Sequence, residues 1–338
     1  MEHRSTIQEV AKRAGVSNST VSRVLNKNYP VKEETRKRVE EAIEALQFKP
    51  NLLARSLIQD KSHTIGILTP SIENLFFSQV VKGIDRHTRP QDYITFLCTT
   101  DGDPGNERRM LDTLLNRSVD GIIVIDPQTE NVKSGLYEKV GRRIPLVLVN
   151  GWYKGVDCNY VLNDEVAGAV EALGHFLREG HRRIAFLRGN RSHSYDVKEE
   201  AYREFLAEEG LEPKGGQVLR IADGNGQETV EQARRAVREA LGDRQGTFDA
   251  LLCCNDWMAL GALRAVRELK LVPGREISIM GFDNTLISEI ADIPISTVDH
   301  HMTRLGQTAA QRLFEVIGEP KQKTRKIIMQ TDLVIRST

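Results

Sequence analysis

The sequence predicts a small all-α head followed by a long α/β region of doubly wound parallel sheets. Three observations in the 338-residue chain predict this organisation. Residues 6–26 have the pattern of two short helices joined at a glycine. From about residue 62 onward, apolar runs of strand length alternate with amphipathic helical stretches. This second part is long enough to form two compact lobes beyond the head.

The first helix of the head is expected to begin after Thr6. Thr6 stands three residues before Glu9, which is the spacing of a capping box. Gly15 favours the left-handed conformation that ends a helix. Between these two signals, apolar residues recur at helical spacing and predict one buried stripe, made by Ile7, Val10, Ala11 and Ala14.

A second helix is expected after Ser17, a residue type that caps helix N-termini well. Val21, Val24 and Leu25 fall on one face of this helix, and polar residues cover the other. In a major groove, Arg reads guanine edges, Asn reads adenine edges, and hydroxyl groups contact phosphates or bases. The pattern therefore predicts a helix-turn-helix, although a solvated helical hairpin has the same periodicity. The residues expected to contact DNA in the head are Thr6, Ser17, Asn18, Ser19, Thr20, Ser22, Arg23 and Asn26.

A third helix completes the small core of the head. Glu33 and Glu34 suit its positively polarised N-terminus, and Val39 and Ala42 lie on its apolar face. Residues 1–60 contain 11 Lys and Arg against 8 Asp and Glu, whereas the whole chain is neutral. This surplus is small, so we expect DNA affinity to depend on individual contacts and on the pairing of two heads.

The rest of the chain has the pattern of buried strands separated by helices. Such a pattern predicts parallel sheets with helices on both faces. In sheets of this kind, ligands bind outside the carboxyl ends of the strands. Buried strands are expected at residues 63–70, 93–99, 121–125, 145–149, 183–187, 250–254 and 277–280.

Several literal motifs resemble those of the LacI/GalR family of bacterial transcription regulators. The head contains AKRAGV followed by SxxTVSRVLN, and the later motifs are DGIIV, NDxxA, GHRRIAF, NDxMALGAL and GFDN. The resemblance therefore covers essentially the whole chain. It implies a periplasmic-binding-protein-like core of two doubly wound lobes with an effector bound between them. The expected divisions are a head at 1–49, a hinge helix and linker at 50–61, an N-terminal lobe at 62–161 plus 291–323, and a C-terminal lobe at 162–290 plus 324–338.

The segment after the third helix resembles the family hinge, PNxxARSL. In relatives this segment folds on DNA, and the leucine that matches Leu57 enters the minor groove. An apolar side chain placed there unstacks a base step, and the resulting kink allows further contacts. An ordinary linker anchored by its leucines is the alternative. The hinge residues that the resemblance assigns to DNA binding are Asn51, Ala54, Arg55 and Leu57.

The resemblance also places effector contacts in the loops that follow strands. Phe76 and Phe77 match ligand-contacting positions, and two adjacent rings at a helix start are not expected to face one core. Asp256 matches an acidic contact that accepts sugar hydroxyls, although its position also suits a helix cap. A sugar or sugar derivative is the effector that the family implies. The expected effector contacts are Phe76, Phe77, Asn150, Trp152, Ser192, Ser194, Tyr195, Lys198, Asp256 and Asp283.

One departure from the family pattern concerns Lys198. Many relatives have an arginine there, in RxxGF, and a lysine lacks the two-pronged hydrogen bonding of a guanidinium. The effector is then held differently, or regulation depends on a phosphorylated carrier protein as coeffector. Residues 301–304 lack the Met-Tyr-Asp associated with that interface, so a small ligand is preferred over the protein coeffector.

Other classes of function are disfavoured by the sequence. The chain has no P-loop, GxSxG or HExxH motif, and its histidines and four cysteines lack the spacing of a metal site, so neither an enzyme nor a cofactor is expected. A secreted solute-binding protein would begin with a signal peptide, and residues 1–30 contain no apolar segment of that kind. We therefore expect a cytoplasmic, nucleoid-associated protein with no membrane partner. Because one helix-turn-helix reads few base pairs, we expect a homodimer on a palindromic operator.

Overall fold

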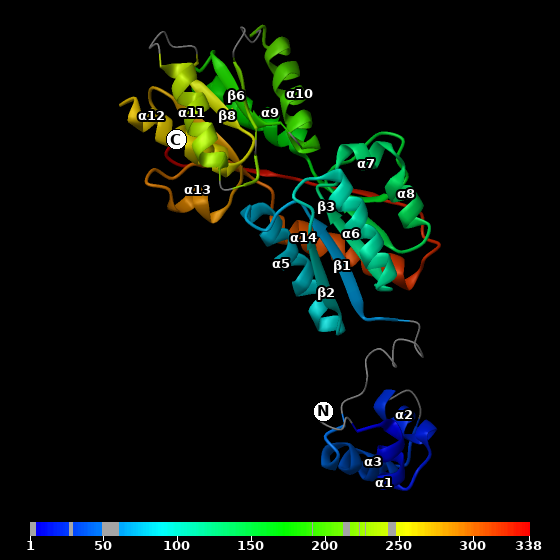
Figure 1. Cartoon of the computed structure of the whole chain (residues 1–338). Helices are drawn as coiled ribbons and strands as arrows, with labels where there is room; N and C mark the ends of the chain where they lie inside the picture. Colours follow the sequence, from blue (N-terminus) through cyan, green and yellow to red (C-terminus); the bar gives the residue numbers. More distant parts are fainter. Residues whose placement is uncertain are drawn as a thin grey trace. The chain divides into compact units, whose positions relative to one another are not determined.

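The computed structural model describes residues 5–26, 30–48, 61–190, 192–211, 217–222, 224–226, 228–242 and 248–338. The chain separates into two compact units, Met1–Ser62 and His63–Thr338 (Figure 1). Each unit has its own apolar core.

The smaller unit is the expected helical head. Its helices are α1 (Ile7–Ala14), α2 (Asn18–Asn26) and α3 (Glu33–Ala45). Val10, Val21 and Val39, one from each helix, are fully buried and form the centre of its core. The apolar stripes predicted from periodicity therefore meet as expected.

The predicted capping signals of the head are present. Thr6 and Glu9 form a complete capping box, in which Glu9 Oε2 accepts from the Thr6 amide at 2.7 Å. Gly15 ends α1 in the left-handed region at φ 66°. The Ser17 hydroxyl accepts from the Thr20 amide at 3.2 Å. Lys32 precedes α3 and makes no capping bond with its side chain, so this helix begins with a weak cap.

The first sheet of the larger unit has six parallel strands in the order β11-β5-β4-β3-β1-β2. Ile67 of β1 lies beside Leu97 of β2 and Ile123 of β3. The strands are β1 (Thr64–Thr69), β2 (Ile94–Thr99), β3 (Gly121–Ile125), β4 (Leu146–Val149), β5 (Asn159–Asn163) and β11 (Lys326–Met329).

The second sheet also has six strands, in the order β12-β10-β9-β8-β6-β7. Only β12 is antiparallel to its neighbour, β10. The strands are β6 (Ile184–Gly189), β7 (Val218–Ile221), β8 (Ala250–Cys253), β9 (Ser278–Asp283), β10 (Ser296–Asp299) and β12 (Asp332–Val334). The doubly wound parallel class predicted from the sequence is confirmed for both sheets.

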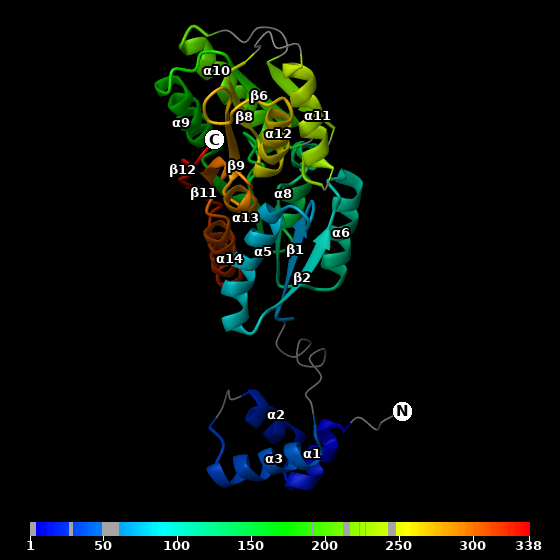
Figure 2. The ribbon, with the colours of Figure 1, turned by 90° about the vertical axis from the view of Figure 1, so that its left-hand side faces the viewer.

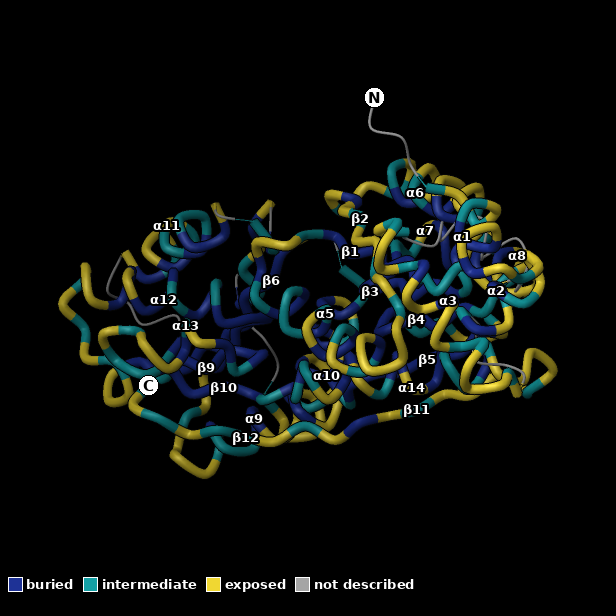
Figure 3. Tube along the Cα trace, turned by 90° about the horizontal axis from the view of Figure 1, so that it is seen from below, coloured by how far each residue is buried: buried dark blue, intermediate teal, exposed yellow. Residues whose placement is uncertain are grey.

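Helices cover both faces of each sheet (Figure 2). The first sheet lies between α5 (Leu75–Thr88) with α14 (Met302–Gly318) and the helices α6 (Pro104–Asn116), α7 (Thr129–Lys133) and α8 (Leu136–Gly141); the short helix η1 (Arg89–Gln91) follows α5. The second lies between α9 (Glu165–Arg178) with α10 (His193–Glu208) and α11 (Thr229–Leu241) with α12 (Asp256–Glu268); α13 (Leu286–Ile290) follows β9. Figure 3 shows the buried residues along the strands and the exposed residues on the outer helical faces.

The chain passes between the two sheets three times, after β5, after β10 and after β11. These crossings differ from the expected lobe boundaries. Residues 296–299 pair with β9 in the second sheet, although they were assigned to the first lobe. Residues 326–329 pair with β5 in the first sheet, although they were assigned to the second. Both segments are short, so their membership depends on strand pairing rather than on local periodicity.

The expectation that residues 93–99 form a buried strand is wrong in one respect. The strand exists as β2, but Ile94, Phe96 and Leu97 are 57 %, 41 % and 44 % exposed. The reason is topological, because β2 is the edge strand of the first sheet. Its apolar sequence resembles that of the buried central strands.

Among the described residues, no helix is both long enough and apolar enough to cross a membrane.

Candidate functional site: a reading head and a cavity at the strand ends

The outer face of α2 presents most of the residues expected to contact DNA. Asn18, Ser19 and Arg23 are exposed, and Thr20 and Ser22 are partly exposed. The side chain of Asn26 lies outside the described residues, as do Asn51, Ala54, Arg55 and Leu57 of the expected hinge. The described part of α2 therefore has the polar outer face that major-groove recognition requires.

Two of the expected DNA contacts have a structural task as well. The Thr6 hydroxyl completes the capping box of α1. The Ser17 hydroxyl lies 2.8 Å from the Ser19 hydroxyl and 2.9 Å from the Thr20 hydroxyl. These interactions hold the start of each helix and fix the positions of the side chains that follow.

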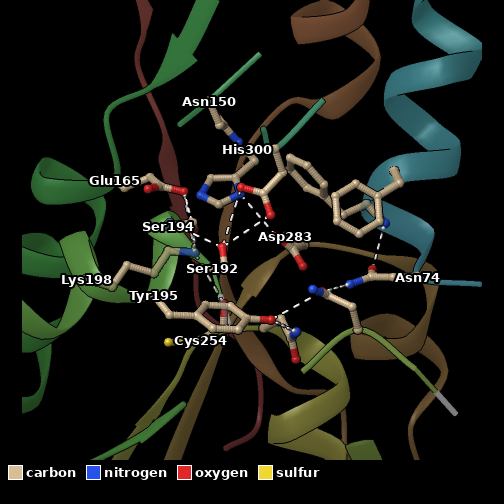
Figure 4. Close-up of a pocket in the computed structure, with 15 residues that line it drawn as sticks. Asn74, Asn150, Glu165, Ser192, Ser194, Tyr195, Lys198, Cys254, Asp283 and His300 are labelled. Carbon is tan, nitrogen blue, oxygen red and sulfur yellow. Dashed lines mark hydrogen bonds and ion pairs between the residues drawn. The ribbon is translucent and has the colours of Figure 1, made fainter. Parts of the chain in front are cut away.

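A cavity lies where the carboxyl ends of the two parallel sheets face each other (Figure 4). Its walls come from the ends of β3, β4, β6, β7, β8, β9 and β10 with the loops that follow them, and from the starts of α5, α9 and α10. Its volume is about 30 Å³, which is room for only a few water molecules. The lining residues are Asn74, Phe76, Phe77, Asp126, Asn150, Glu165, Ser192, Ser194, Tyr195, Lys198, Asn225, Cys254, Asn255, Asp283 and His300.

On one side of the cavity, Lys198 forms a buried polar cluster at the start of α10. Its Nζ donates to Ser194 Oγ at 3.0 Å and to the Cys254 carbonyl oxygen at 3.3 Å, and lies 3.7 Å from Glu165 Oε1. Ser194 Oγ in turn donates to Glu165 Oε1 at 2.5 Å. The ammonium also lies 4.3 Å from the centre of the Phe282 ring. Lys198 is therefore held in place by the protein's own groups.

At the end of β9, Asp283 pairs with His300 from the crossing after β10. The Asp283 Oδ1 and His300 Nδ1 atoms are 3.1 Å apart. Burial raises the pKa of Asp283 to about 7, an effect that the nearby Lys198 opposes. Burial, reinforced by the positive charge of Lys198, lowers the pKa of His300 to about 3. His300 is consequently a neutral imidazole at physiological pH.

Two hydrogen bonds connect the loops of the two sheets across the cavity. Asn74 Nδ2 donates to Asn225 Oδ1 at 2.9 Å, and Ser192 Oγ donates to Asp126 Oδ2 at 3.2 Å. Burial and the charge of Glu165 raise the pKa of Asp126 to about 7. A ligand larger than a few waters has to displace these contacts or separate the loops that make them.

All the expected effector residues line the cavity except Asp256 and Trp152. Asp256 is fully buried, where its carboxylate accepts from the Thr285 amide at 2.7 Å and from the Thr297 hydroxyl at 2.7 Å. It is not the helix cap either, because Asn255 caps α12. Trp152 packs in the first lobe with Lys326 Nζ 3.4 Å from its ring centre. Asp256 therefore holds the loops around β9 and β10 together, and both of its carboxylate oxygens accept hydrogen bonds within the fold.

The two adjacent aromatic residues also differ from expectation. Phe76 and Phe77 are both buried in the same apolar cluster, with ring centres 5.4 Å apart and an interplanar angle of 86°. Both reach the cavity wall because the end of the core and the cavity meet at the start of α5. Residues that sequence reasoning missed as ligand contacts are Asn74, Asp126, Glu165, Asn225, Cys254, Asn255 and His300. Asp126, Cys254 and His300 directly follow β3, β8 and β10, whereas the others lie two to five residues beyond a strand end, where the sequence gives no comparable signal.

In the described part of the chain, no three His, Cys, Asp or Glu residues gather in a way that would hold a metal ion. Burial raises the pKa of the Cys254 thiol to about 12, so this residue of the lining is a protonated, unreactive thiol. The arrangement provides hydrogen-bonding groups and charges for binding, without an activated nucleophile.

The comparisons with known proteins agree with both parts of the chain. Residues 6–51 match the family of bacterial regulatory proteins described as lacI family, and residues 173–338 match a periplasmic binding protein-like domain. The repressor PurR of Actinobacillus pleuropneumoniae is 32% identical over 98% of this chain and 97% of the relative. The probable repressor ExuR of Bacillus subtilis is 31% identical over 98% of each.

Solved structures extend the similarity to the whole fold. The lac repressor dimer bound to operator and the anti-inducer ONPF has a TM-score of 0.88, with 26% identity over 99% of each chain. The regulator CelR in complex with cellobiose has a TM-score of 0.72, with 25% identity over 99% of each chain. A head of this kind on a two-lobed core defines a DNA-binding transcriptional repressor with a ligand-binding core. The chain belongs to the lacI family of bacterial regulatory proteins. The relatives named above are transcriptional repressors and not enzymes.

Proposed function

We propose that the cavity at the strand ends binds a sugar or sugar derivative that controls the affinity of this repressor for its operator. The observation that supports this most directly is the set of polar side chains gathered there from nine different loops, strand ends and helix starts. Amide, hydroxyl and carboxylate groups around an aromatic wall are suited to a polyhydroxylated ligand. The likeness to a cellobiose complex supports the same class.

Two other effector classes follow from specific observations. A purine-related effector is the second candidate, since several relatives are PurR repressors and the Phe76 and Phe77 rings offer an apolar wall. A phosphorylated carrier protein is a further candidate, because the resemblance implies an arginine at the position of Lys198 in many sugar- and purine-responsive relatives. The cluster that Lys198 forms inside the cavity favours a small ligand.

DNA reading is assigned to the outer face of α2 together with the hinge. In this proposal Asn18, Ser22 and Arg23 contact base edges, and the remaining polar residues of the head contact phosphates or fix the helix starts. Asn51, Ala54, Arg55 and Leu57 act in the minor groove when the hinge folds on the operator.

The repressor acts as a homodimer on a palindromic operator in the cytoplasm, associated with the nucleoid. The likeness to a lac repressor dimer supports this state. The exposed apolar residues of β2 are the surface that we assign to the dimer, because a long apolar edge strand left open favours pairing with a second chain. The two heads then read two half-sites related by a two-fold axis.

The proposed mechanism links the cavity to the operator through the angle between the lobes. The cavity has room for only a few water molecules. Two hydrogen bonds cross it, one between Asn74 and Asn225 and one between Ser192 and Asp126. An effector that enters breaks or rebuilds these contacts, so its binding energy favours a different lobe arrangement. That arrangement sets whether the two hinges meet on DNA.

The test begins with selecting the operator from random DNA with the purified full-length protein. Thermal unfolding is then measured with mono- and disaccharides, sugar phosphates and nucleobases, since a ligand of the folded state raises the melting temperature. A sugar that raises it and changes operator affinity supports the proposal. A nucleobase that does so replaces the sugar, and a phosphorylated carrier protein acting alone removes the cavity from regulation.

A further inference from the structure

The described residues around the cavity carry more carboxylates than cations. Asp126, Glu165 and Asp283 line it, and Lys198 is the one Lys or Arg in the described lining. The Lys198 ammonium lies 3.7 Å from Glu165 and shares Ser194 with it. One ammonium thus faces three carboxylates: it lies closest to Glu165, and its charge also lowers the pKa of Asp126 and of Asp283, against the effect of burial.

Asp126 and Asp283 have only neutral hydrogen-bond partners within the described part of the chain. Asp126 accepts from the Ser192 hydroxyl at 3.2 Å, and Asp283 lies 3.1 Å from the neutral His300. Removing a carboxylate from water is costly unless a cation or several donors replace the water. The raised pKa values of Asp126 and Asp283, about 7 each, have burial as their first cause. A positive charge placed in the cavity would offset this cost.

His300 gives an independent indication that a ligand completes the cavity. It is 1 % exposed and lines the cavity, and its Nε2 atom has no hydrogen-bond partner among the described residues. When Asp283 is ionised, the neutral imidazole donates from Nδ1 to Asp283, so Nε2 is an acceptor. A buried acceptor of this kind needs an O–H or N–H donor. With Asp283 ionised, the groups at this end of the cavity that a ligand can bind, His300 Nε2 and the carboxylates, are therefore hydrogen-bond acceptors.

Resting on the proposed function, we infer that the effector carries a protonated amine beside its hydroxyl groups, as an amino sugar does. The ammonium is held by Asp126 and Asp283, and a hydroxyl or N–H group donates to His300 Nε2. The asparagine amides at the opposite wall bind further hydroxyls. A uronate or a sugar phosphate is rejected, because its negative charge would lie beside these carboxylates in a buried site.

The inference is tested on the full-length protein with matched sugars that differ in charge. The amines are glucosamine, galactosamine and mannosamine; the neutral parents are glucose, galactose and mannose; the anions are glucuronate, galacturonate and glucose 6-phosphate. Thermal unfolding identifies binders, and calorimetry at pH 7 gives their dissociation constants. We expect one amine to bind at least about tenfold more tightly than its parent, because close buried charge pairs exceed the energy of that factor. We expect no shift with the anions.

Variants then assign the selectivity to the two carboxylates. The change of Asp126→Asn together with Asp283→Asn should reduce the preference for the amine over its neutral parent to less than about threefold, since a neutral pair of amides no longer favours a charge. The change Asp112→Asn removes an exposed carboxylate of α6, in the lobe that contains Asp126, and should keep the full preference. Unfolding curves without ligand establish whether each variant is folded. If the double variant does not fold, the comparison of amines with their neutral parents on the wild-type protein still tests the inference.

The outcomes separate the inference from the function on which it rests. A neutral sugar that binds as tightly as its amine, or an anion that binds, overturns the cationic effector and leaves a small-molecule repressor in place. If a nucleobase raises the melting temperature in the same assay and none of these sugars does, the cationic effector is likewise overturned and a small-molecule repressor remains. If no compound shifts unfolding, both the cationic effector and the sugar-controlled cavity are rejected.

Discussion

At the scale of single residues, the core uses buried carboxyl groups for two different purposes. Asp256 is satisfied by three donors from Thr285 and Thr297, and it joins loops. Asp126 and Asp283 line the cavity and have fewer donors. An aspartate therefore stabilises the fold at the position of Asp256, whereas Asp126 and Asp283 remain able to bind a ligand in the cavity.

The titration of Asp126 gives a first prediction. Burial raises its pKa to about 7, the negative charges of Glu165 and Glu107 add to this rise, and the Ser192 hydrogen bond and the charge of Lys198 oppose it. Because the folded protein holds the Asp126 proton more tightly than the unfolded chain does, protonation of Asp126 stabilises the fold. This stabilisation is complete below the unfolded-state pKa of about 4 and is lost as the pH rises through 7. Asn does not titrate, so Asp126→Asn should gain stability relative to wild type from pH 5 to pH 8, by on the order of 2 kcal/mol.

Urea unfolding of both proteins at pH 5, 6, 7 and 8 measures this difference. The titration of His300, whose pKa is lowered to about 3, works in the opposite direction below pH 6.5 and is common to both proteins. Asp112→Asn serves as the exposed control. A difference that stays constant with pH would show that Asp126 is ionised at all these values.

A second prediction concerns Arg23, which is exposed on the outer face of α2. If its guanidinium reads a base edge, Arg23→Ala should weaken binding to the selected operator by about 1–3 kcal/mol and relax preference at one base position. Fluorescence anisotropy with operator and with single-base variants measures both effects. Uniform weakening on every DNA sequence would instead assign Arg23 to a phosphate.

At the scale of elements, the packing of α5 against α14 depends on two glycines. A Cβ atom on Gly83 would lie 2.1 Å from the Thr303 carbonyl oxygen, and one on Gly306 would lie 2.0 Å from that of Val80. At both glycines the atom that a Cβ would meet belongs to the backbone of the other helix. A change of side-chain rotamer therefore cannot relieve either clash. These glycines bring together two helices that are more than 200 residues apart in the sequence.

Gly306→Ala should therefore destabilise the core, although alanine is the better helix former. We expect a loss of about 1–3 kcal/mol from forcing the helices apart. Gly318→Ala in the same helix is the matched control, since its Cβ would meet nothing within 4 Å. Urea unfolding compares the three proteins, and equal stability of the two variants would mean that α5 and α14 separate at little cost.

At the scale of the whole molecule, the proposed function requires two copies of this chain. Phe96 and Leu97 leave apolar surface on the open edge of the first sheet, where β2 has one strand neighbour. The opposite edge strand, β11, exposes Ile328. Covering the edge of β2 in a dimer would remove both its apolar surface and its unpaired backbone groups from solvent.

Phe96→Asp should raise the dissociation constant of the dimer at least about tenfold, because a charge in an apolar interface costs more than the energy of that factor. Operator affinity should fall with it, since a single head reads few base pairs. Sedimentation measures the dimer, and Ile328→Asp on the opposite edge is the control. Dissociation by the Ile328 variant alone would move the interface to β11.

The sequence by itself determined the local structures and the class of protein. The capping box at Thr6, the turn at Gly15 and the apolar runs of the central strands act over a few residues, so their periodicity predicts them. The membership of β10 and β11, the exposure of β2 and the burial of Asp256 were decided only by the tertiary structure. The physical reason is that strand pairing and burial depend on partners far away in the chain, as does the meeting of Asp126, Asp283 and His300 around one cavity.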